Sequence, residues 1–277
     1  MVASAVPAAI RIILHILTVI TFIPQYVRIM RVTDAGGISM VYALLNAISF
    51  TEEFTICLLS IVSFSDEPVS PGLDGWCDFI QFVLALAGQV GIFILIVVLP
   101  GHRLGSRLIA LLLYIVYLML AIIPVAVPAI ASPWKGSDSL VGVVHGVHTL
   151  IANPIITILG LGGAIFAQAR EISRQPSPGA LDVLTLESQA VVFAILAICW
   201  PWRLVNPSDD AGFVSWYRFV GWPCVHSAIF AIGQGVLWWK AMNRAARIGG
   251  ADLTATPETE PLLRTSSTAG EPLSESR

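Results

Sequence analysis

Charged residues are scarce in this sequence. Asp, Glu, Lys and Arg make up 12% of its 277 residues, whereas soluble proteins carry about 25%. Hydrophobic residues reach 56%, and the mean hydropathy is +0.81. A helix needs about 20 apolar residues to cross a bilayer, and runs of this length recur along the chain. The composition excludes an ordinary soluble domain and predicts an all-α integral membrane protein surrounded by lipid.

Motifs of catalysis are missing as well. The chain has no G-x-S-x-G, no H-E-x-x-H and no phosphate-binding glycine loop, so we expect neither an enzyme nor a cofactor or metal site. Nothing in it predicts a nucleic-acid partner. Cysteine is limited to Cys57, Cys77, Cys199 and Cys224, in or beside apolar segments. We interpret these as small buried side chains, with a luminal pairing of Cys77 and Cys224 left open.

Seven apolar segments are expected to form transmembrane helices. They lie at about 8–31, 40–64, 76–99, 106–130, 147–170, 183–205 and 214–240. Lys and Arg gather after the first, third, fifth and seventh segments, as at Arg31, Arg107, Arg174 and Lys240. The positive-inside rule then predicts a luminal or external N-terminus and a cytosolic C-terminus.

Residues 249–277 are rich in Ser, Thr, Pro and Glu and are predicted to form a disordered cytosolic tail. Within it, Glu258 precedes Leu262 and Leu263 in the sequence ETEPLL, which is similar to acidic dileucine sorting signals. Clathrin adaptors read such signals on cargo bound for lysosomes or vacuoles. We therefore expect a clathrin adaptor as a partner of the tail and a vacuolar or lysosomal membrane as the location.

The chain also contains a weak internal repeat. A shift of 143 residues places Gln25 on Gln168 and Gly36 on Gly179. Other identities at this shift are Ile29 on Ile172, Arg31 on Arg174, Ala47 on Ala190 and Phe50 on Phe193. A shift of 145 places Gly88-Gln89 on Gly233-Gln234. We expect residues 8–99 and 147–240 to be two parallel three-helix repeats, joined by a linker helix at 106–130.

The first repeat carries a recognisable motif. Pro24-Gln25, then Arg28 and Arg31, then Gly37-Ile38-Ser39, resembles the PQ-loop motif. The wider family includes cystinosin, the lysosomal and vacuolar cationic amino acid exporters and, more distantly, the SWEET sugar carriers. The resemblance in layout covers residues 8–240. The second repeat departs from the motif, with Ala167-Gln168 in place of Pro-Gln and Asp182 in place of Ser39.

The resemblance implies a seven-helix carrier that works by alternating access, with the motif prolines as hinges. Only Pro24 matches that role, so we expect the two halves to move unequally. Gln25 and Gln168 are expected to face the gap between the halves. Proton-coupled members of the family carry an acid on the last span, and this chain has none between Phe213 and Trp239. The coupling ion and the substrate class are therefore left open.

Ionisable groups inside the predicted spans are candidates for proton coupling, since each carboxylate costs about 2.5–3.5 kcal/mol to place at mid-bilayer. The candidates are Glu52, Glu53, Glu187 and His226. Glu53 shares a helical face with Asn46 and Ser49, which favours it as the acid that faces a cavity. Glu52 is then expected to pair with another helix. The alternative is that both acids are neutral or paired within the bundle.

Amide and hydroxyl side chains in the spans are candidates for the substrate pathway. They are Tyr42, Asn46, Gln81, Gln89, Gln189 and Gln234. Asn46 and Gln189 coincide in the repeat and are the preferred pair, because amides both donate and accept hydrogen bonds and suit a zwitterionic or polyhydroxy ligand. Bonding between helices is the alternative for each of them.

These features predict a secondary transporter of small polar solutes, amino acids first among them, with proton coupling left open. A seven-span nutrient sensor or receptor that signals through its cytosolic face is the alternative. A cargo receptor or lipid-linked-sugar helper of the same fold is a third interpretation. The parallel repeat favours the carrier, because a G-protein-coupled receptor has no such repeat.

Overall fold

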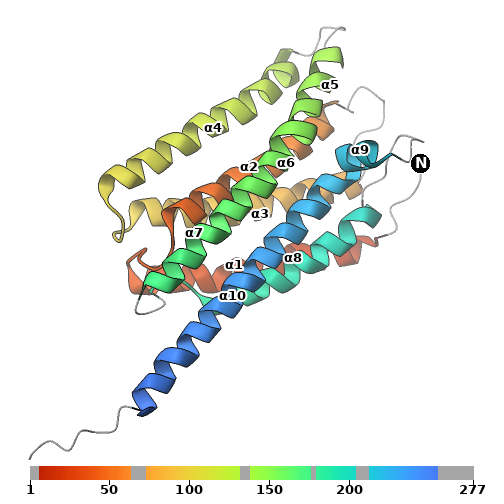
Figure 1. Ribbon diagram of the computed structural model, residues 1–277. Coiled ribbons are helices and arrows are strands. Elements are labelled where there is room, and N and C mark those ends of the chain that lie inside the picture. Colours follow the sequence, from red (N-terminus) through yellow and green to blue (C-terminus); the bar gives the residue numbers. More distant parts are fainter. Residues whose placement is uncertain (1–5, 64–72, 132–137, 176–178, 204–211, 255–277) are drawn as a thin grey trace, which may run out of the picture.

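The structure is a computed structural model that describes residues 6–63, 73–131, 138–175, 179–203 and 212–254. The first four helices are α1 (Ala8–Val32), α2 (Met40–Ser63), α3 (Leu73–Val98) and α4 (Leu104–Ala131). The fifth stretch runs through α5 (Asp138–Val147), η1 (His148–Ala152), α6 (Asn153–Ile155), η2 (Ile156–Gly160) and α7 (Leu161–Arg174). After it come α8 (Val183–Arg203) and a last stretch of α9 (Phe213–Trp216), η3 (Tyr217–Gly221) and α10 (Trp222–Thr254). Within the described residues, seven of these stretches are long and apolar enough to cross a membrane, and they pack side by side in Figure 1.

Most helix bounds agree with the sequence prediction, but the fifth and seventh helical stretches are longer than expected. The fifth begins at Asp138 rather than near 147, and the seventh continues to Thr254 instead of ending near 240. In the seventh, the apolar run ends while good helix formers such as Ala, Met and Arg continue. The helix therefore extends past residue 249, where the tail was predicted to start. The predicted sorting signal at Glu258, Leu262 and Leu263 lies outside the described residues.

Prolines inside the spans are accommodated without ending the helices. The π-helical turns η1 and η2 flank Pro154, and η3 directly precedes Trp222 and Pro223. Proline lacks a backbone N–H and crowds the preceding turn, and a π-turn widens the helix locally. Helix α1 continues through Pro24, so the hinge assigned to this residue stays a prediction.

The helices form two three-helix units that pack in the same way. In the first unit α3 packs on both α1 and α2, and in the second unit α10 packs on both α7 and α8. The units meet through α1 with α8 and through α2 with α7. The shift of 143 residues relates α1 to α7 and α2 to α8, so each of these contacts has its counterpart. Helix α4 packs against α2 beside this arrangement (Figure 1).

Two glycines allow the close packing of α3 on α1 and of α10 on α7. A Cβ atom added to Gly88 would lie 2.6 Å from the ring of Phe22, and one added to Gly233 would lie 2.3 Å from Cδ1 of Ile165. Gly88 and Gly233 coincide in the repeat, as do Phe22 and Ile165. The same contact of a glycine with a large side chain therefore sets how closely α3 packs on α1 and how closely α10 packs on α7.

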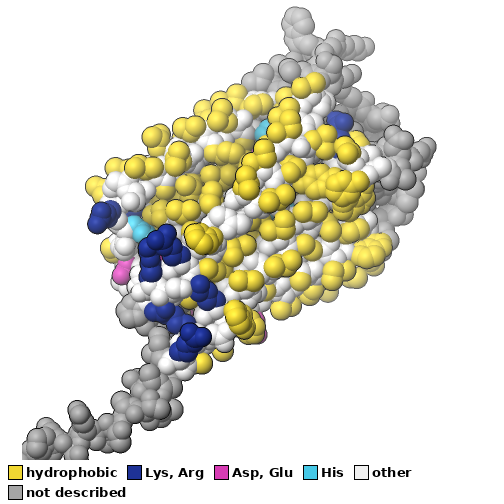
Figure 2. All heavy atoms as spheres, viewed as in Figure 1, with side chains coloured by type: hydrophobic (Ala, Val, Ile, Leu, Met, Phe, Trp, Pro, Cys, Tyr) yellow, Lys and Arg dark blue, Asp and Glu magenta, His cyan; other side chains and the backbone are white. Residues whose placement is uncertain are grey.

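The outer surface of the helix bundle is hydrophobic, as expected for an integral membrane protein. Figure 2 shows hydrophobic side chains covering the length of the bundle, with most of the visible Lys and Arg gathered at the end from which α10 projects. Exposed large hydrophobic residues occur on every long helix, for example Ile16, Leu112, Leu159 and Ile232. Such an apolar surface is suited to contact with the lipid of a bilayer.

We expect Gly88→Ala and Gly233→Ala to destabilise the protein by about 1–3 kcal/mol each, because the new methyl group overpacks a filled contact. Thermal unfolding of the purified protein in detergent measures this. Gly162→Ala in α7 is the control, since a Cβ there meets no atom within 4 Å, and it should leave stability unchanged or raise it by up to about 1 kcal/mol. Equal melting temperatures for all three variants would contradict the packing account.

Candidate functional site

The motif glutamines join the two units by a reciprocal exchange of hydrogen bonds. Gln25 on α1 donates from Nε2 to the carbonyl oxygen of Ala180 at 2.6 Å, and its Oε1 accepts from the amide of Asp182 at 2.9 Å. Gln168 on α7 donates to the carbonyl oxygen of Gly37 at 2.9 Å, and its Oε1 accepts from the amide of Ser39 at 2.8 Å. Both side chains are buried. Each glutamine thus satisfies the backbone of the segment that follows the equivalent helix in the other unit.

This exchange follows the repeat residue by residue. Ala180 and Asp182 lie 143 residues after Gly37 and Ser39, the same spacing as between Gln25 and Gln168. The bonds use backbone groups of the partner segments, so the replacement of Ser39 by Asp182 in the second repeat leaves them intact. Because the segments after α1 and α7 meet, the two helices end on the same side of the bundle and run in the same direction.

The two segments also touch directly. The amide of Ala180 donates to the carbonyl oxygen of Gly36 at 2.7 Å, and Arg28 Nε donates to the carbonyl oxygen of Gly179 at 2.9 Å. Gly179 has φ of 56°, and a Cβ there would lie 2.3 Å from the Gly36 oxygen. Gly37 has φ of 95°, another left-handed conformation that favours glycine. The glycines of the motif permit this close crossing of two backbones.

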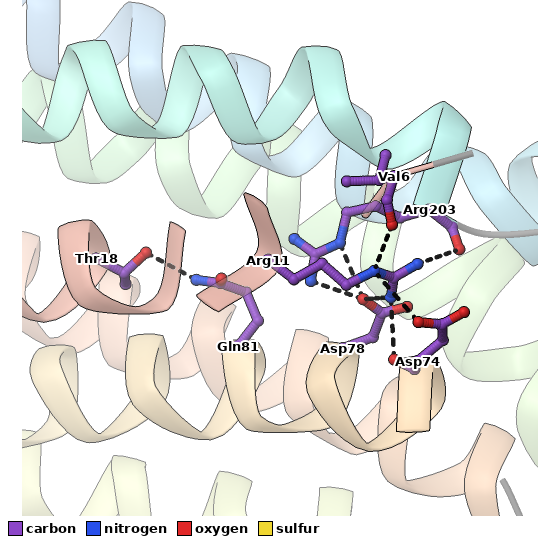
Figure 3. Close-up of polar contacts among 7 residues, drawn as sticks. All are labelled: Val6, Arg11, Thr18, Asp74, Asp78, Gln81 and Arg203. Atoms are coloured by element: carbon purple, nitrogen blue, oxygen red, sulfur yellow. Dashed lines mark hydrogen bonds and ion pairs between the residues drawn. The ribbon is translucent and has the colours of Figure 1, made fainter. Parts of the chain in front are cut away.

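A buried ion cluster holds the opposite end of the same interface (Figure 3). Asp78 on α3 accepts at Oδ1 from Arg11 on α1 at 2.7 Å and from Arg203 on α8 at 2.6 Å and 2.9 Å. The side chains of both arginines are fully buried. Arg11 also lies 3.7 Å from the carboxylate of Asp74, which is half exposed. The cluster therefore ties α8 of the second unit to α1 and α3 of the first.

The sequence did not predict the contact of Arg11, Asp78 and Arg203. A signal was present, because Arg11 and Arg203 both fall within predicted spans, where a charge needs a partner. Arg203 additionally lies over the ring of Trp200, with 4.1 Å between its guanidinium carbon and the ring centroid. Such a contact helps to stabilise a desolvated guanidinium.

Between the glutamine exchange and the ion cluster lie two small buried cavities. The first, which we call the Gln189 cavity, is lined by Gln25, Tyr42, Gln89, Thr185 and Gln189, among others. Gln25 belongs to the sequence motif, and Tyr42, Gln89 and Gln189 are pathway candidates from the sequence. These buried side chains come from both units. Its volume of about 20 Å³ holds about one water molecule, so these donors and acceptors become available to a polar solute only when the cavity widens.

Of the other three pathway candidates, Gln81 lines the second cavity described below, and Asn46 and Gln234 lie on α2 and α10. The Tyr42 hydroxyl donates to Oε1 of Gln234 at 3.0 Å. Asn46 is buried, and its Nδ2 has no hydrogen-bond partner. The structure thus brings Tyr42, Gln89 and Gln189 to one cavity and connects Gln234 to it through Tyr42, whereas Asn46 does not line it.

The second cavity, which we call the Glu53 cavity, is lined by Glu53, Gln81, His226 and Ser227 together with aromatic side chains. Glu53 Oε1 accepts from Asn153 Nδ2 at 2.6 Å, while Oε2 lies 3.9 Å from His226 Nδ1 and has no hydrogen-bond partner. The Nε2 atom of His226 lies 2.8 Å from the Ser49 hydroxyl.

The remaining two acids lie elsewhere. Glu52 contacts His148 Nδ1 at 2.8 Å and accepts from the Tyr117 hydroxyl at 2.5 Å, so it is paired with other helices. Glu187 is exposed on α8 and lines neither cavity. Among the coupling candidates, only Glu53 and His226 share a cavity between the units.

The cysteines make no disulfide, since Cys57, Cys77, Cys199 and Cys224 are all free thiols. The described residues also contain no group of three or more His, Cys, Asp or Glu side chains placed to hold a metal ion.

No known protein family, curated protein or solved structure matches this chain. The class that the fold defines is an all-α integral membrane protein, with seven helical stretches among the described residues that are long and apolar enough to span a membrane. The likeness to PQ-loop proteins accordingly rests on the motif residues of the sequence itself.

Removing the central carboxylate of the ion cluster should strongly destabilise the protein. We expect Asp78→Asn to cost about 3–5 kcal/mol, because it removes the buried carboxylate that Arg11 and Arg203 share. Asp74→Asn is the matched control and should cost less than about 1 kcal/mol, since its ion pair is long and half exposed. Denaturation of both variants in detergent measures the difference, and equal stabilities would contradict the assigned role of Asp78.

Proposed function

We propose that this protein is a secondary transporter that moves small polar solutes, amino acids first among them, by alternating access between its two three-helix units. The observation that carries the proposal is the Gln189 cavity. It is buried, it lies between the units, and amide or hydroxyl groups of both units line it. Transporters built from parallel repeats bind their solutes in this place.

The contacts at the two ends of the interface supply the gates that such a mechanism needs. At one end the glutamine exchange comprises four hydrogen bonds. A typical hydrogen bond contributes about 0.5–1.5 kcal/mol net, so the four together contribute about 2–6 kcal/mol. At the other end the Arg11–Asp78–Arg203 cluster closes the interface. If the contacts at one end open while those at the other end stay closed, the cavities are exposed to one side of the membrane at a time.

The direction in the membrane is part of the same proposal. Basic residues gather at the end of the bundle that carries the glutamine exchange, which favours a cytosolic location for that end by the positive-inside rule. The ion cluster and the N-terminus would then face the lumen or the outside. The vacuolar or lysosomal location and the clathrin adaptor rest on the tail sequence ETEPLL.

Gln189→Leu tests the substrate pathway. We expect it to lower the initial rate of amino acid uptake into proteoliposomes by about tenfold or more, because a substrate group that loses its hydrogen bond costs about 1.5 kcal/mol. Glu187→Gln lies two residues away on the exposed face of α8 and should leave uptake unchanged.

A panel of labelled amino acids and sugars, measured with and without a proton gradient, gives the readout for these variants. Absence of uptake for every solute by a folded wild-type protein would contradict the proposal. Solute binding without uptake would favour the alternative of a nutrient sensor.

A further inference from the structure

Two buried acceptor atoms belong to residues that line the Glu53 cavity and have no hydrogen-bond partner among the described residues. One is the carboxylate oxygen Oε2 of Glu53 and the other is the amide oxygen Oε1 of Gln81. Their side chains come from α2 and α3 and are almost fully buried, at 1% and 2% exposure. A buried polar atom without a hydrogen bond is costly, so one carboxylate oxygen and one amide oxygen beside one cavity require an explanation.

The hydrogen bonds around Gln81 fix the direction of its amide. Thr18 donates its hydroxyl proton to the carbonyl oxygen of Leu14 at 2.8 Å, so this hydroxyl can only accept from Gln81. Gln81 Nε2 does donate to Thr18 Oγ1, at 2.7 Å (Figure 3). The amide oxygen Oε1 of Gln81 is therefore the atom of this side chain that has no hydrogen-bond partner. The cavity thus presents acceptors, and Asn153 already uses the second oxygen of Glu53.

Aromatic rings form the rest of the wall. Phe50, Phe82 and Phe193 line the cavity. The Phe82 ring stacks on both Trp200 and Trp222, with 4.9 Å and 5.1 Å between centroids, so these contacts occupy its faces. The cavity has room for about one water-sized group, which is the size of the nitrogen of an ammonium group.

Within the described part of the chain, no Lys or Arg lines the cavity around this carboxylate. Among the residues that line the cavity, His226 is the only basic one, and its Nδ1 is 3.9 Å from Glu53 Oε2. Arg203 stacks on Trp200, but its guanidinium is engaged by Asp78. A cation that carries N–H groups would donate hydrogen bonds to both Glu53 Oε2 and Gln81 Oε1. It would also balance the charge of the Glu53 carboxylate.

We propose that the Glu53 cavity is a binding site for a primary ammonium group, held by hydrogen bonds to Glu53 Oε2 and Gln81 Oε1 inside a wall of aromatic side chains. The inference goes beyond the proposed transport function, because such binding requires no transport. The ammonium group belongs either to a simple amine or to the amino end of an amino acid.

Equilibrium binding of radiolabelled methylammonium to the full-length protein in detergent tests this site. We expect saturable binding to the wild type and at least tenfold weaker binding to Glu53→Gln and Gln81→Leu. Glu52→Gln is the matched control, because its carboxylate is next in sequence but is paired with Tyr117 and His148 outside the cavity. It should bind methylammonium like the wild type.

Competitors identify the chemistry. Ethylamine should displace methylammonium, and tetramethylammonium should not, because it has no N–H to donate. Displacement by glycine as well would assign the ammonium group to an amino acid, and its failure to compete would assign it to a simple amine. No saturable binding to a folded wild type, or unchanged binding to Glu53→Gln, would overturn the proposal. Glu53 would then be a group that binds a proton and no ammonium ligand. Because uptake is not measured here, a failure of this site is distinct from a failure of transport.

Discussion

The reciprocal bonding of Gln25 and Gln168 is the constraint on which the arrangement of the two units depends. Each glutamine reaches out of its own helix and pairs with one carbonyl and one amide of the opposite unit. The geometry is self-consistent only if α1 and α7 run in parallel and end together. It also requires close backbone crossing, which Gly179 permits, because a Cβ atom there would lie 2.3 Å from the carbonyl oxygen of Gly36. The proline of the motif takes no part in these bonds, so its absence at Ala167 leaves them intact.

Polar and charged groups in this protein are concentrated where the units meet, and lipid-facing positions are apolar. The glutamine exchange lies at one end of the interface, the Arg11–Asp78–Arg203 cluster lies at the other, and the two cavities lie between them. Within the units, glycines allow close contacts with large side chains, such as Gly88 with Phe22. Apolar side chains also pack across the interface, as where Phe50 contacts Phe193 and Phe82 stacks on Trp200.

The sequence predicted the spans well because hydropathy is a local property, and it predicted the equivalence of Gln25 and Gln168 because the repeat survives at these positions. It did not predict the lengths of the fifth and seventh helical stretches, since a helix continues wherever helix formers continue, whether or not lipid surrounds them. The pairing of Arg11 with Arg203 through Asp78 joins residues up to 192 positions apart, and local patterns carry no information about such contacts. The empty acceptor of Gln81 was likewise hidden, because its direction depends on the hydrogen bonds of Thr18.

The central claim, that the glutamine exchange holds the units together at one end, can be tested most directly by a distance measurement across it. Arg31 and Arg174 are exposed at the ends of α1 and α7, and cysteines introduced there can carry spin labels once the four native cysteines are replaced. With Gln25 and Gln168 intact, we expect one dominant short distance between the labels. In the Gln25→Ala, Gln168→Ala double variant, a second and longer distance should become populated. An identical distance distribution in both proteins would contradict the account.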